Sequence, residues 1–102
     1  MKSSNLTPYD PAEYLDTEEK QRLFLEAALE ESDAEYFAHA VGIVIRARGA
    51  SLVARETGLA RASLYKSFRE GGNPEFGTVL RVLHALGIDL KLSPSQPAKT
   101  AA

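Results

Sequence analysis

The sequence of 102 residues has no cysteine, two histidines and no long hydrophobic run. Without cysteine, neither a disulfide nor a thiolate metal site can form, so packing of apolar side chains has to stabilise the fold. The opening residues lack the apolar stretch of a secretory signal, and no run is long enough to span a membrane. We therefore expect one small, soluble, cytoplasmic domain with tails and no membrane partner.

The scarcity of reactive side chains argues against catalysis. His39 and His84 are the two histidines, and neither has a second ligand at a spacing that metal sites use. A serine nucleophile would need one of them as its base, and both fit surface or boundary positions better. The stretch EGGNP at 70–74 follows a predicted helix and lacks the lysine of a phosphate-binding loop. We predict a protein that is not an enzyme and has no cofactor or metal.

Charge is segregated along the chain, although the net charge is only −2. Residues 1–45 carry three Lys or Arg against ten Asp or Glu, and residues 46–69 carry six against one. The net charges of these two segments are −7 and +5, and that of residues 70–102 is zero. A basic segment of this kind is what a phosphate-binding surface needs. The alternative is a solvated face on which charges cluster by chance.

Apolar residues recur at helical spacing, which predicts an all-α fold of five helices around one core. The expected N-caps are Thr17, Asp33, Ser51 and Asn73, and Pro74 is expected as the first residue of the last helix. The first helix is expected to end at about residue 31, the second at an αL cap at Gly49, and the third at Gly58. The fourth helix is expected to span 61–70, and the fifth to end at Gly87. The last helix is expected to present one apolar face, formed by Phe76, Val79, Leu80, Leu83 and Leu86.

The ends of the chain differ in composition from this helical region. Residues 1–17 contain Pro8 and Pro11 and are expected to form an extended arm. The helical domain is expected to span 18–92, and its last part, IDLKL at 88–92, alternates apolar and polar residues as a short strand or an extended segment would. Residues 93–102 have no large apolar side chain and are expected to be disordered.

Gly58 interrupts the amphipathic stretch SLVARETGLARASLYKSF at 51–68. A glycine inside a helix costs about 1 kcal/mol relative to alanine. It is better explained as a residue with positive φ that ends one helix and lets the next begin at a steep angle. Two short helices joined in this way are the frame of a helix-turn-helix motif, here residues 51–70. A plain helical hairpin with a basic surface is the alternative.

The second helix of this motif has one apolar and one exposed face. Leu64 and Phe68 are expected to point inward with Leu59. The opposite face forms one stripe of five residues: Arg61, Ala62, Tyr65, Lys66 and Arg69. Arg61 is the candidate for a contact with a guanine edge, and Lys66 and Arg69 are candidates for phosphate contacts, while Tyr65 suits either. Ser51 and Asn73 are also candidates for backbone phosphates.

The stretches ARETGL, SLYK, GNPEF and VLRVLHALG, with DPAEYL upstream, resemble the lambda-repressor-like (Xre-type) helix-turn-helix family. More narrowly, the sequence from about Tyr9 to Leu92 is similar to the addiction-module antidote proteins, the HigA-like antitoxins. The resemblance implies a lambda-repressor-like fold, a homodimer on a palindromic DNA operator, repression of its own operon, and a basic RelE-like ribonuclease toxin as partner. It also accounts for Gly58 as the turn glycine.

Three residues depart from that family's pattern. Leu52 stands where a polar residue is usual, and Ala60 and Ala62 replace a serine and a polar residue near the start of the recognition helix. A missing N-cap hydroxyl costs about 1 kcal/mol of helix stability. Besides a DNA-binding antitoxin, two functions stay open: a toxin-neutralising interaction module without operator binding, and a stand-alone phage-type repressor. For an antitoxin, charge predicts toxin contacts in the N-terminal arm and first helix.

Overall fold

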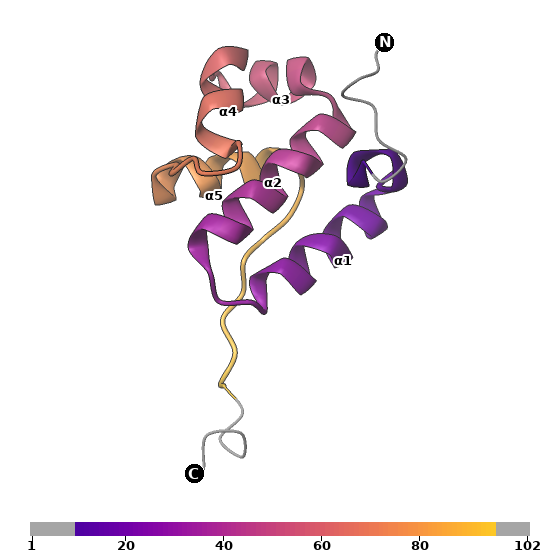
Figure 1. The fold of residues 1–102 in the computed structure, drawn as a ribbon, viewed down its shortest axis with the longest axis vertical. Coiled ribbons are helices and arrows are strands. Elements are labelled where there is room, and N and C mark those ends of the chain that lie inside the picture. Colours follow the sequence, from indigo (N-terminus) through magenta and orange to yellow (C-terminus); the bar gives the residue numbers. More distant parts are fainter. Residues whose placement is uncertain (1–9, 96–102) are drawn as a thin grey trace.

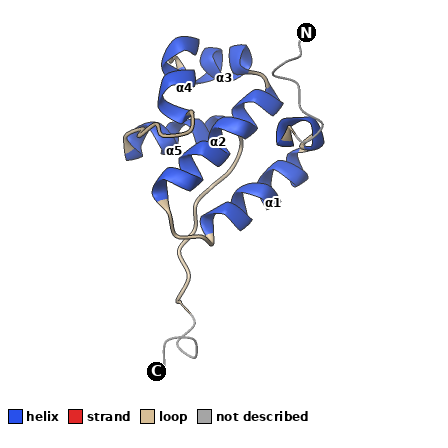
Figure 2. Cartoon of the chain, viewed as in Figure 1, coloured by secondary structure: helices blue, strands red, loops and turns tan. Residues whose placement is uncertain are grey.

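A computed structural model of the chain describes residues 10–95. These residues form a 3-10 helix, η1 (Pro11–Tyr14), and five α-helices: α1 (Glu18–Leu29), α2 (Ala34–Arg48), α3 (Ala50–Thr57), α4 (Arg61–Phe68) and α5 (Phe76–Ala85). Within this range there is no strand, and the IDLKL segment is extended without pairing (Figure 2). The all-α, five-helix prediction is confirmed. Residues 1–9 of the expected arm and 96–102 of the expected tail lie outside the described residues.

Helix α2 is the centre of the fold. It contacts η1, α1, α3 and α4, while α5 packs against α3 (Figure 1). Val41, Val44 and Ile45 of α2 are almost completely buried. They meet the apolar sides of the surrounding helices, such as Leu25 of α1 and Leu83 of α5, in one hydrophobic core. The apolar residues that recur at helical spacing along α2 therefore form the axis of the core.

Gly42 is the point at which α4 comes closest to α2. A Cβ atom at this position would collide with the backbone carbonyl of Phe68. Only glycine permits such an approach of two backbones. The close contact seats the Phe68 side chain, which is 2% exposed, directly on α2.

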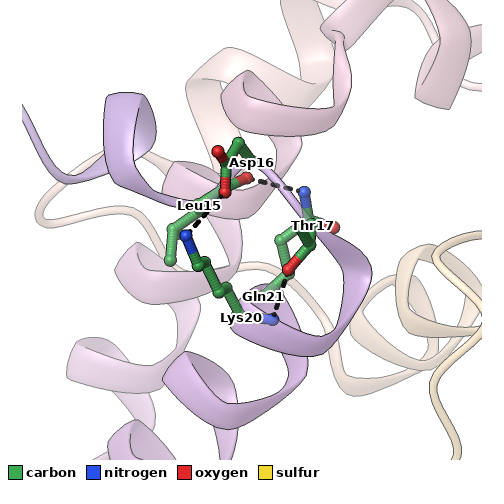
Figure 3. A network of polar contacts seen from close by, with 5 residues as sticks. All are labelled: Leu15, Asp16, Thr17, Lys20 and Gln21. Carbon is green, nitrogen blue, oxygen red and sulfur yellow. Dashed lines mark hydrogen bonds and ion pairs between the residues drawn. The ribbon is translucent and has the colours of Figure 1, made fainter.

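Two predicted N-caps are confirmed. The Thr17 hydroxyl accepts a hydrogen bond from the Lys20 backbone N–H at 3.1 Å, as Figure 3 shows. The Asp33 carboxylate accepts bonds from the backbone N–H groups of Glu35 and Tyr36 at 3.0 and 3.2 Å. Each satisfies donors that the first turn of a helix leaves free.

The other two predicted N-caps, Ser51 and Asn73, are wrong, as is the αL cap predicted at Gly49. Gly49, not Ser51, is the N-cap of α3, and Ser51 lies inside the first turn. Gly49 has φ 115° and ψ 110°, and these angles lie outside the αL region. Helix α5 begins at Phe76 with Glu75 as its N-cap, so Asn73 and Pro74 belong to the preceding loop. Pro74 instead lines a groove beside the first turn of α2, a tertiary position that local cap signals do not encode.

The apolar face expected on α5 divides into a buried and an exposed part. Val79, Leu83 and Leu86 are buried in the core, as expected. Phe76 and Leu80, on the same side of the helix, are 69% and 40% exposed. Periodicity places all five side chains on one side of the helix, but only packing decides how far along the helix that side is covered.

The start of the described chain packs on the domain and does not extend away from it. Leu15 is buried in the core, and its carbonyl accepts a hydrogen bond from the Gln21 side chain at 2.9 Å (Figure 3). The extended arm predicted for 1–17 is therefore wrong over η1 and Leu15. At the surface beside them, the Lys20 ammonium bonds Asp16 at 2.9 Å and lowers the pKa of that carboxyl.

Within the described residues, no single helix is both long and apolar enough to cross a membrane. Only α2 and α3 together reach that length and composition, and they meet at a bend of 106°. The apolar side chains of α2 are buried in the core of the domain.

Candidate nucleic-acid interface

The turn between α3 and α4 has the geometry that its sequence predicts. Gly58 has φ 77° and ψ 9°, in the left-handed region, and its N–H donates to the carbonyl of Ala54 at 2.9 Å. A Cβ at Gly58 would meet nothing within 4 Å. The backbone conformation, and not lack of space, is therefore the reason for glycine here. Thr57 completes the turn, because its hydroxyl donates to the Val53 carbonyl and accepts from the Leu59 N–H.

Helix α4 has the two faces expected of it. Leu64 and Phe68 are 1% and 2% exposed and enter the core. On the opposite side, the side chains of Arg61, Tyr65 and Lys66 are exposed. The guanidinium carbon of Arg61 lies 5.8 Å from the centroid of the Tyr65 ring, within the range of a cation–π contact. The two side chains thus lie together on the outer surface of the first turn and a half of α4.

The basic side chains of this surface have no acidic partners in the described part of the chain. On α1, by contrast, Lys20 pairs with Asp16 and Arg22 pairs with two glutamates. The cations without such an ion pair on or next to the motif are Arg55, Arg61, Lys66 and Arg69. An anionic ligand would meet positive charge that the protein itself has not neutralised.

Two arginines of the basic segment belong to the structure of the domain and not to this surface. Arg46 pairs with Asp10 at 2.6 Å. Arg48 is half-buried and donates from Nε and Nη2 to the Gln21 side-chain oxygen at 3.0 and 2.8 Å, and from Nη2 to the Leu86 carbonyl at 3.2 Å. The balance of +5 counted along the sequence therefore overstates the charge of the motif.

The remaining predicted site residues occupy different places. Ala62 is exposed on α4, and Arg69 follows its last residue as the C-cap. Ser51 is exposed in the first turn of α3, just beyond the end of α2. Asn73 is exposed beside the groove at the beginning of α2. Ser51 and Asn73 therefore lie at opposite ends of α2, whose 15 residues span about 22 Å.

Sequence reasoning missed one residue and one interaction of the candidate surface. Arg55 is exposed in the last turn of α3 and was counted only as a charge. The contact between Arg61 and Tyr65 was signalled by their spacing of four residues, which places two side chains side by side on a helix. Among residues 10–95, no group of three His, Asp or Glu side chains is placed to hold a metal ion.

The fold and this surface define a class: a small all-α protein with two short helices joined at a left-handed glycine and an exposed cationic face. Residues 5–94 match the family described as "Probable addiction module antidote protein". The chain belongs to this family, and is an antidote, or antitoxin, to a cognate toxin. An uncharacterized protein of Haemophilus influenzae is 37% identical over 94 residues, covering 92% of this chain and 97% of the relative. No solved structure matches the chain.

Proposed function

We propose that this antitoxin is also a DNA-binding repressor of its own operon, with a lambda-repressor-like fold in which α3, the Gly58 turn and α4 form the helix-turn-helix motif. The observation that carries the proposal is the outer face of α4, where exposed cations have no ion-pair partner in the described residues. Elsewhere in the basic segment, arginines bond to the protein's own side chains. A surface left cationic in this way suits a polyanion.

Roles on the DNA follow from position along α4. Arg61 is its first residue, where a recognition helix inserted in the major groove meets base edges, and a guanidinium can bind guanine with two hydrogen bonds. The Tyr65 ring restrains Arg61 on the helix surface. Lys66, Arg69 and Arg55 neutralise phosphates. Ser51 adds a phosphate contact at the start of α3, and Asn73 adds one if the duplex extends toward the beginning of α2.

The partners of this function are a palindromic operator, bound by a homodimer, and a basic RelE-like toxin. The N-cap residue of α4, Ala60, makes no side-chain hydrogen bond to the first turn. A second candidate function is an antitoxin that neutralises its toxin but does not bind an operator. It is favoured by Ala60 and Ala62, whose apolar side chains offer no hydrogen bond to DNA.

Binding to a duplex of the protein's own promoter region, measured by fluorescence anisotropy at two salt concentrations, tests the operator function. Arg61→Ala is expected to weaken specific binding by about 1–3 kcal/mol, because it removes a base contact and a charge. Lys20→Ala, on α1 and paired with Asp16, is the matched control and is expected to leave the affinity unchanged.

The two functions give different results in this assay. Affinity for the promoter that exceeds affinity for random DNA and falls steeply with salt supports the repressor. Equal affinity for both duplexes favours the interaction module. An Arg61→Ala variant with unchanged specific affinity would contradict the base contact assigned to Arg61.

A further inference from the structure

An apolar groove lies where the end of α1, the beginning of α2 and the beginning of α5 meet. It holds about 300 Å³. Its apolar lining comes mainly from Leu29 of α1, Phe37 of α2, Pro74 and Phe76 at the start of α5, and Leu90 of the segment that follows α5. That segment runs past the connection between α1 and α2 (Figure 1), so parts of the chain that are far apart in the sequence form the groove together.

Three large apolar side chains of the groove are open to solvent. Phe76 is 69% exposed, Leu29 46% and Leu90 38%. The core takes other residues of α5, so the fold itself does not account for an aromatic side chain at the first position of this helix. Exposed apolar side chains that gather at a hollow and are bordered by charge mark a surface that another protein covers. A single exposed aromatic residue commonly supplies much of the binding energy of such a surface.

A second hollow, of about 450 Å³, continues the groove along α1. The two hollows share Leu29, Phe37 and Leu90. Together they form one depression between α1 and the segment after α5. A depression of this kind accepts a helix or an extended segment of a partner, whose apolar side chains enter it at intervals.

The border of the groove is acidic. Residues 26–35 contain five Asp or Glu and no Lys, Arg or His. Asp33 lines the groove, and Glu30 and Glu31 are exposed beside it. None of the described residues that line the groove is basic, whereas Glu75 is exposed nearby without lining it. Of the two cations at the second hollow, Arg22 is already paired with Glu19 and Glu26. A partner therefore meets an apolar hollow with negative charge at its edge.

We infer that the cognate toxin docks in this groove, through a segment that carries an apolar side chain between basic residues. An antidote has a toxin as its partner, and a basic segment complements the acidic border. The same border disfavours the phosphates of an anionic duplex. It also disfavours a second copy of the chain, because a symmetric contact through the groove would bring the acidic residues 26–35 of the two copies together.

This inference deepens the proposed function by locating the surface for its toxin partner, and it does not depend on operator binding. Charge along the sequence predicts toxin contacts in the arm and first helix. The groove adds the beginning of α5 and the segment after it, which that charge pattern does not indicate. Leu29 and Phe76 are not among the residues assigned to DNA, so toxin binding and promoter binding can fail separately.

Truncation of the exposed apolar side chains tests the groove, by calorimetric titration of the full chain with the purified cognate toxin. Phe76→Ala is expected to raise the dissociation constant of the complex about tenfold or more, and Leu29→Ala about fivefold, because each removes an apolar contact. Leu23→Ala is the matched control, since Leu23 lies on the same helix as Leu29, is 48% exposed and does not line the groove. It is expected to leave the dissociation constant unchanged. Circular dichroism of each variant checks that the fold is retained.

Weaker toxin binding by Phe76→Ala and Leu29→Ala, with normal binding by Leu23→Ala, would support the groove. Normal binding by the two groove variants, or an equal loss in all three variants, would overturn it. Sedimentation of the same variants without toxin tests the other occupant. Loss of self-association with normal toxin affinity would assign the groove to a contact between copies and overturn the inference. A chain without preference for promoter DNA whose groove variants lose toxin binding would overturn the repressor function alone.

Discussion

The role of Arg48 in the structure differs from the role that its sequence context predicts. In the sequence it adds one charge to the basic segment at 46–69. In the structure its guanidinium joins the Gln21 side chain to the Leu86 carbonyl, 27 and 38 residues away. Gln21 is 4% exposed, and its amide in turn donates to the Leu15 carbonyl. No local pattern predicts a contact between residues so distant in the chain.

Substitution of Arg48 is expected to destabilise the fold, because the Gln21 side-chain oxygen and the Leu86 carbonyl lose their hydrogen-bond donor. Arg48→Ala is expected to lower the free energy of unfolding by about 2–3 kcal/mol, since the Gln21 oxygen loses its charged donor. Arg46→Ala, two residues earlier, breaks the exposed pair with Asp10 and is expected to cost about 1 kcal/mol or less. Urea unfolding monitored by circular dichroism measures both. Equal losses in the two variants would contradict a structural role for the Arg48 network.

At the scale of elements, the sequence predicted which stretches form helices and a turn better than it predicted the residues at which the helices begin and end. Periodicity located all five helices, and Gly58 located the break between α3 and α4, because both signals are local. Asn73 and Pro74 are equally good local start signals, yet α5 begins at Phe76. Which face of α4 is exposed was also predictable. That Arg46 and Arg48 of the basic segment bond within the domain could be seen only in the tertiary structure.

The crossing of α2 and α4 gives a test in which two similar substitutions have opposite effects. Gly42→Ala is expected to destabilise the fold by about 1–3 kcal/mol, because the new methyl group collides with the Phe68 carbonyl. Gly77→Ala in α5 meets nothing within 4 Å and is expected to stabilise it by up to about 1 kcal/mol. Thermal unfolding of the two variants checks both signs. A neutral Gly42→Ala variant would contradict the close approach of these helices.

For the molecule as a whole, the segregation of charge suggests two partners on two surfaces. Exposed cations lie on α3 and α4, and acidic residues predominate on α1 and its flanks. The sequence predicted toxin contacts in residues of the arm and first helix. Leu15 is part of the core, so deletion of residues 1–16 would damage the fold as well as the contact surface. Substitution of exposed charges is the cleaner experiment.

Reversing two exposed acidic residues at the end of α1 tests this arrangement. Glu30→Lys/Glu31→Lys is expected to weaken binding of a basic toxin about tenfold or more, because like charges then face each other. Glu56→Lys/Glu75→Lys carries the same charge change outside this region and is the control. Calorimetric titration with the cognate toxin measures both. Equal weakening by the two variants would assign the effect to net charge and contradict a toxin surface on α1.

The Arg48 bridge also has a mechanical consequence. It lies two residues before α3, and the carbonyl that it binds, that of Leu86, lies two residues before the extended segment at 88–92. One guanidinium therefore links the start of α3 to the end of α5. A displacement of the segment after α5 would therefore be transmitted through these hydrogen bonds to the start of α3.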